Sequence, residues 1–123
     1  LFKHTQKLPL KYFDNNTIGD NVFEEYKGAF TENYVLQQLK SLPRTFVYYY
    51  NNDNSTLEID FVVQHEAHVI PIEVKAEENL RAKSLRQFVT DNSGLHGVRF
   101  SMSDYREQDW LTNVPLWAVR WAF

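Results

Sequence analysis

The chain has 123 residues, of which 43% are hydrophobic and 15% aromatic, so we expect one folded domain with a single core. It contains no Cys, which excludes disulfides and thiolate metal sites. The net charge of −3 argues against strong nonspecific binding to DNA. No apolar run approaches the ~20 residues that a membrane-spanning helix needs, and no signal-peptide pattern is present, so we expect a cytoplasmic protein without a membrane partner.

The first part of the chain leads into a helix. The sequence opens on Leu1 rather than Met, so we expect an excised fragment, with residues 1–20 as its N-terminal lead-in and 21–123 as the domain. From about residue 20 to 40, apolar side chains recur at steps of three and four residues, and Pro43 lies beyond the end. This pattern predicts the first helix.

The rest of the chain alternates between strand patterns and one more helix. The aromatic and β-branched TFVYYY predicts a strand over 45–50, and the polar NNDNST predicts a loop over 51–56. We further expect strands at 57–64 and 68–75, a helix over 77–91, a strand at 98–102, a polar connector over 103–109 and a final strand over 115–123. The order α-β-β-β-α-β-β predicts an α/β fold with a mixed central sheet flanked by helices. The single helix between the third and fourth strands predicts a crossover to a parallel neighbour.

The stretch EIDFVVQHEAHVIPIEVKA (58–76) places acids inside two apolar strands. A turn of two or four residues pairs the strands so that Asp60 lies across from Glu73, and Glu58 across from Lys75. Opposed side chains share a face at roughly 5 Å between Cβ atoms, and the other face is apolar. A turn of three or five residues would instead send Asp60 and Glu73 to opposite faces.

Two opposed carboxylates repel each other unless something compensates. A raised pKa, the neighbouring Lys75 or a bound cation would each do so. Oxygen ligands favour a hard ion such as Mg²⁺ or Mn²⁺, which is often held by one or two carboxylates plus waters. The first helix adds a further acid, Glu32. Helical spacing places it on the same stripe as Leu36 and Leu39. An unpaired charge buried on such an apolar stripe is costly.

These residues resemble the PD-(D/E)XK nuclease superfamily, which has the restriction-endonuclease-like fold: an acid on a leading helix, an Asp in one strand and Glu-x-Lys in the next. More narrowly, the chain is similar to the C-terminal domain, catalogued as of unknown function, of a prokaryotic family of AAA-type ATPases. The segments that carry this similarity are YKGAFTENYVLQQL (26–39), EIDFVV (58–63), IPIEVKAEEN (70–79), KSLRQF (83–88) and VPLWAV (114–119).

The resemblance implies a function and a role for each residue. Asp60 and Glu73 would ligate Mg²⁺ or Mn²⁺, Lys75 would position or activate the attacking water, and Glu32 would support the site from the helix. The reaction would be metal-dependent hydrolysis of phosphodiester bonds in nucleic acid, with DNA as a candidate partner. The ATPase module of the same full-length chain would be the other partner. The four glycines form no GxxxxGK[ST] loop, so we expect no ATP site here.

Two alternatives stay open on the sequence. The acids and Lys75 could form a cross-strand salt-bridge network on a solvent-facing sheet surface. The domain could also be a catalytically inactive docking or regulatory module of the ATPase that retains the nuclease fold. The negative net charge favours this second reading, as does the absence of a Gln-x-x-x-Tyr element, because Gln87 is followed four residues later by Asp91.

Overall fold

The computed structural model describes residues 2–4, 20–50, 57, 59–76 and 82–123. Its strands are β1 (Phe2–His4), β2 (Thr45–Tyr50), β3 (Phe61–His65), β4 (His68–Lys75), β5 (Gly97–Ser101), β6 (Arg106–Glu107) and β7 (Leu111–Pro115). Its helices are α1 (Asp20–Lys40), α2 (Lys83–Asp91) and the 3₁₀ helix η2 (Leu116–Trp121). None of these helices is long and apolar enough to cross a membrane.

The strands form one mixed sheet in the order β1-β2-β3-β4-β5-β7-β6. Strands β1 to β4 pair antiparallel with one another, the pairs β4–β5 and β5–β7 are parallel, and β6 pairs antiparallel with β7. Helix α2 connects β4 to its parallel neighbour β5, as the crossover prediction required. The predicted α/β class with a mixed sheet flanked by helices is confirmed, and the arrangement is compatible with a restriction-endonuclease-like core.

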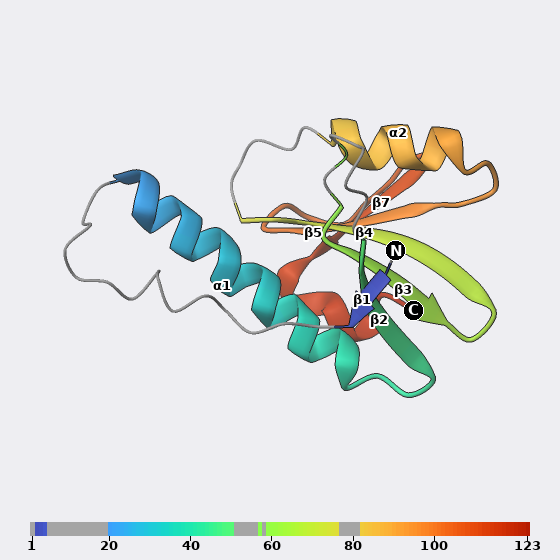
Figure 1. Cartoon of the computed structure of the whole chain (residues 1–123), viewed down its shortest axis with the longest axis horizontal. Coiled ribbons are helices and arrows are strands. Elements are labelled where there is room, and N and C mark those ends of the chain that lie inside the picture. Colours follow the sequence, from blue (N-terminus) through green and yellow to red (C-terminus); the bar gives the residue numbers. More distant parts are fainter. Residues whose placement is uncertain (1, 5–19, 51–56, 58, 77–81) are drawn as a thin grey trace.

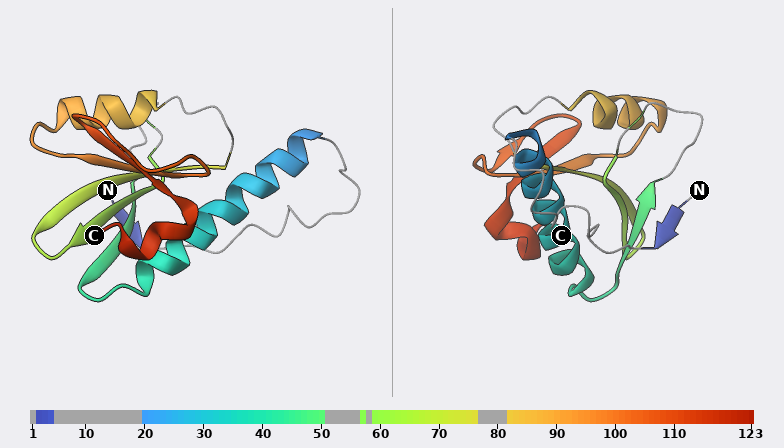
Figure 2. Two further views of the ribbon diagram at one scale, coloured as in Figure 1. Left: turned by 180° about the vertical axis from the view of Figure 1, so that it is seen from behind. Right: turned by 60° about the vertical axis from the view of Figure 1, so that its left-hand side comes forward.

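The helices divide between the two faces of the sheet (Figures 1 and 2). Helices α1 and η2 cover one face, and the main hydrophobic core lies between them and the sheet. Helix α2 covers the other face over a smaller cluster of Leu85, Val89 and Leu111. The first half of α1 extends past the edge of the sheet, whereas its second half, with Leu36 and Leu39 buried, packs against the core (Figure 1).

The predicted final strand over 115–123 is wrong. The strand at this place is β7, which ends at Pro115, and residues 116–121 form η2. Apolar and aromatic composition favoured a strand, but the buried positions repeat every third residue. Leu116 and Val119 face the core, and Trp117 and Trp121 are exposed. This period of three suits a 3₁₀ helix, in which residues i and i+3 share a face.

The other element boundaries differ less from expectation. The predicted helix over 77–91 is α2, which begins at Lys83, and residues 77–81 lie outside the described part of the chain. The predicted strand over 57–64 is β3, which begins only at Phe61. The predicted loop over 51–56 also falls outside the described residues.

Candidate functional site

The β3–β4 hairpin has the predicted register. Phe61 pairs with Ile72 and His65 with His68, around a two-residue turn. Pairing stops there, so Asp60 does not form the expected backbone pair with Glu73. Asp60 lies in a bend before β3, and its Oδ2 accepts a hydrogen bond of 2.6 Å from the backbone N–H of Val74. The carboxylate thus takes the place of a main-chain acceptor at the end of the ladder. Glu58 lies outside the described residues.

Glu73 is a buried carboxylate in the middle of the sheet. Only 6% of the residue is exposed, and its Oε1 lies 3.4 Å from Nζ of Lys75, two residues further along β4. Among the described residues, no hydrogen-bond partner reaches the buried Oε2. Burial raises the pKa of Glu73, and the charges of Lys75 and Arg99 act against that rise. A buried polar atom without a partner is costly, and therefore marks a place where a ligand could be bound.

A second buried charge lies beside Glu73 on the next strand. Arg99 of β5 pairs with Glu73 in the parallel register and is only 7% exposed. Burial lowers the pKa of Arg99; the charge of Glu73 opposes this change, and that of Arg106 adds to it. Sequence analysis missed Arg99. A charged residue in the otherwise apolar strand GVRFS, placed next to β4 by the α2 crossover, is the signal that could have found it.

Asn113 of β7 holds Arg99 in place. Its Oδ1 accepts hydrogen bonds from Nε of Arg99 at 2.9 Å and from Oγ of Ser101 at 2.7 Å. Its Nδ2 donates to the backbone carbonyls of Ser103 and Asp104 at 3.1 and 2.9 Å. Both lone pairs and both protons of the amide are therefore used. Glu73, Arg99 and Asn113 form one polar row across three neighbouring strands.

Glu32 lies on α1 and interacts with Asp60, whereas the charges that act on Glu73 are those of Lys75 and Arg99. The half-buried carboxyl group of Glu32 has its pKa raised from 4.5 to about 7, first by burial and then by the negative charge of Asp60. The structure thus brings Glu32 into the electrostatic range of Asp60, as well as onto the stripe that carries the buried Leu36 and Leu39. Asp60 lies just before the start of β3 and Glu32 lies on α1, whereas Glu73 and Lys75 lie on β4 itself.

The oxygen ligands of this site suit a hard cation to which the protein contributes only one or two ligands. In the described part of the chain, no three His, Cys, Asp or Glu side chains lie close enough together to hold a metal ion. Mg²⁺ is often held by one or two carboxylates and completes its shell with water. The Oε2 of Glu73, which has no partner among the described residues, fits that role, and the expected second ligand is Asp60, whose Oδ2 accepts a hydrogen bond from the Val74 N–H.

A comparison with protein families matches residues 27–119 to a model described as a domain of unknown function, DUF4143. The chain belongs to the DUF4143 family. The matched region begins in α1, ends in η2 and contains Glu32, Asp60, Glu73, Lys75 and the polar row. No curated protein matches the chain. The family description itself assigns no activity to the DUF4143 domain.

Proposed function

We propose that this DUF4143 domain is a PD-(D/E)XK nuclease-type domain, the C-terminal part of an AAA-type ATPase, that hydrolyses phosphodiester bonds in nucleic acid with Mg²⁺ or Mn²⁺. The observation that carries the proposal is the buried Oε2 of Glu73, which has no hydrogen-bond partner in the described part of the chain, while Nζ of Lys75 lies 3.4 Å from Oε1. A carboxylate with one oxygen fixed by a cation and the other unpartnered is prepared to ligate a metal ion.

Each residue has a distinct part in this chemistry. Glu73 and Asp60 would hold the ion. Bound Mg²⁺ favours the ionisation of water and stabilises charge that develops on a phosphate. Lys75, which is one-third exposed at its side chain, can hold a water or a phosphate oxygen beside Glu73. Above about pH 7, where Glu32 is ionised, it adds negative charge near Asp60 and so increases the attraction for a cation.

A cleavage assay tests this proposal. The domain is incubated with single- and double-stranded DNA and Mg²⁺ or Mn²⁺, in parallel with Glu73→Ala and Lys75→Ala. Glu66→Ala is the matched control, because Glu66 is an exposed acid at the opposite end of the same hairpin, paired with Arg44. Cleavage that both site variants lose and the control keeps supports catalysis. Absence of cleavage, together with no metal-dependent rise in melting temperature, rejects it.

A second candidate function is a docking or regulatory module of the ATPase without catalysis. The observation that favours it is the charge balance, since Lys75 and Arg99 already place two cations beside Glu73. Two neighbouring cations weaken the attraction of a carboxylate for a divalent ion. In this case Glu73→Ala destabilises the fold, because Lys75 and Arg99 lose the negative charge between them. Added metal leaves the melting temperature of every variant unchanged.

A further inference from the structure

An apolar groove lies on the face of the sheet opposite the Glu73 row. Its volume is about 850 Å³, and its floor includes Val98 and Val114, whose side chains alternate with those of Arg99 and Asn113. Helix η2 forms one wall, and the segment around β6 forms another. The aromatic residues that line the groove are Tyr105, Trp117, Trp121 and Phe123.

The wall formed by η2 presents large apolar side chains to the solvent. Trp117 is 76% exposed and Trp121 is 75% exposed, and Tyr105 across the groove is 61% exposed. An exposed group of aromatic side chains of this size usually marks an interaction surface. Burying these three side chains would remove roughly 500 Å² from water on one copy, before the groove floor is counted. A stable interface needs about 800 Å² per partner, so this face is large enough to form most of one.

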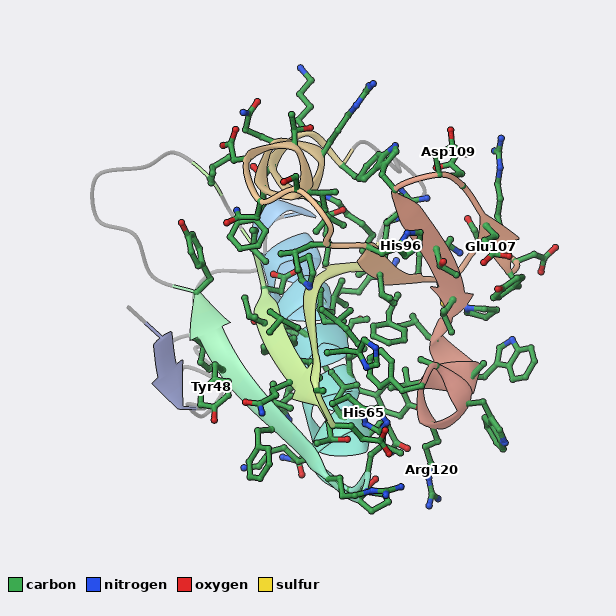
Figure 3. All side chains as sticks on the ribbon, turned by 90° about the vertical axis from the view of Figure 1, so that its right-hand side faces the viewer. Tyr48, His65, His96, Glu107, Asp109 and Arg120 are labelled. Carbon is green, nitrogen blue, oxygen red and sulfur yellow. The ribbon has the colours of Figure 1, made fainter. Side chains whose placement is uncertain are left out.

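Charges around the groove are unevenly placed. Asp104 and Glu107 line it, and none of the described lining residues is Lys or Arg. Arg120 is an exposed cation of η2. Figure 3 shows Glu107 and Arg120 on opposite sides of η2. Helix η2 is therefore a ridge that carries exposed aromatic residues and the cation Arg120, and the acids Asp104 and Glu107 lie on the other wall of the groove.

We propose that two copies of this chain form a two-fold symmetric dimer through this face. A two-fold axis that passes beside η2 relates the two copies so that each contact occurs twice. Arg120 of each copy then meets the acidic wall that carries Glu107 in the other copy. The same operation places Trp117 and Trp121 of each copy against the apolar groove of its partner. The chain thus contains both the apolar, basic ridge and the apolar, acidic groove that the contact needs. This inference does not depend on the proposed nuclease activity, because Glu73 and Arg99 lie on the other face of the sheet.

Sedimentation velocity and light scattering over a micromolar concentration series test the dimer. We expect a concentration-dependent dimer of the wild-type chain. Trp117→Ser should weaken it about a hundredfold, because a central Trp is lost twice in a symmetric interface. Arg120→Glu and Glu107→Lys should each weaken it about tenfold, by replacing attraction with repulsion at two symmetric places. Combining these two changes in one chain restores opposite charges, so the dimer should recover.

The control is Lys83→Glu, which makes the same charge reversal on α2, on the opposite face of the sheet. Circular dichroism confirms that each variant is folded, as expected for substitutions at exposed positions. A wild-type chain that stays monomeric throughout the series overturns the proposal. So does a dimer that Trp117→Ser leaves intact, or a charge-swapped double variant that is no stronger than either single one. DNA cleavage is measured separately, so a failed dimer test leaves the nuclease proposal standing, and the reverse also holds.

Discussion

Asp60 and Val74 are joined by a hydrogen bond of 2.6 Å from the Val74 backbone N–H to the Asp60 Oδ2. Continued pairing in the hairpin register would have matched Val74 with residue 59, but the ladder stops at Phe61. A side-chain carboxylate thus ends the β3–β4 pairing and, at the same place, brings its charge toward Glu32. The same group serves the fold and the candidate site, and substitutions can separate the two roles.

Asp60→Ala removes the acceptor of the Val74 N–H. We expect a loss of about 2 kcal/mol in the free energy of unfolding, which is typical of a charge-assisted hydrogen bond. Asp60→Asn retains a side-chain oxygen as acceptor and removes the charge near Glu32, so it should cost much less above neutral pH. Urea denaturation of both variants measures the difference. Equal losses for the Ala and Asn variants would show that the hydrogen bond is not the stabilising feature.

Glu32 should make stability depend on pH. Its pKa in the folded chain is about 7, above the ordinary value of 4.5 that applies when the chain unfolds. Its neutral form therefore favours folding fully below about pH 4.5, and this contribution is lost as pH rises through about 7. Because the group is only partly buried, we expect a loss of about 2 kcal/mol rather than the full value of the shift. Glu32→Gln should remove this pH dependence, as read from melting temperatures, and Glu66→Gln at an exposed position should retain it.

Metal binding should be visible without catalysis. If Glu73 ligates Mg²⁺ or Mn²⁺, the free energy of unfolding should rise by about 2.7 kcal/mol when the metal is present at about 100 times its Kd. Glu73→Gln, which has nearly the same shape but no charge, should lose this gain. A chelator should reverse the gain in the wild type. An equal rise in Glu73→Gln would place the ion elsewhere on the protein.

Asn113 should be among the most sensitive polar positions in the chain. Asn113→Ala removes four hydrogen bonds and leaves the buried Arg99 without its amide partner. We expect a loss of about 3 kcal/mol in unfolding free energy and faster hydrogen exchange around Ser103 and Asp104. Gln87→Ala is the control, because the bond from Gln87 to Asp91 is exposed and its loss should change stability by less than about 0.5 kcal/mol. Similar effects of the two substitutions would contradict the importance of the buried network.

Local patterns predicted the parts of the fold that neighbouring residues determine. The hairpin register followed from turn length, because an even loop and the two-residue period of strands leave few choices. The helical repeat likewise predicted that Glu32 shares one face of the first helix with Leu36 and Leu39. The DUF4143 match confirms the expected domain of unknown function, whereas its nuclease activity and its link to an ATPase stay predictions.

The features that sequence reasoning missed depend on distant residues. Arg99 lies beside Glu73 only because α2 carries the chain to a parallel strand, and no turn fixes that register. The start of β3 was misplaced because the side chain of Asp60, rather than the backbone, accepts the hydrogen bond from Val74 there. The 3₁₀ helix was missed because Trp117 and Trp121 are exposed. Their aromatic character favoured a strand, and the sequence does not show that these side chains face the solvent.

Strand β4 pairs antiparallel with β3 through a two-residue turn and parallel with β5 across the whole α2 connection. The hairpin can therefore assemble from contacts close in sequence, while β5 and β7 must close a much longer loop before they dock. On this route Glu73 gains Arg99 and the fixed amide of Asn113 only in the final stage of folding. The contact between Glu73 and Arg99 therefore forms late and reports that the whole sheet has assembled.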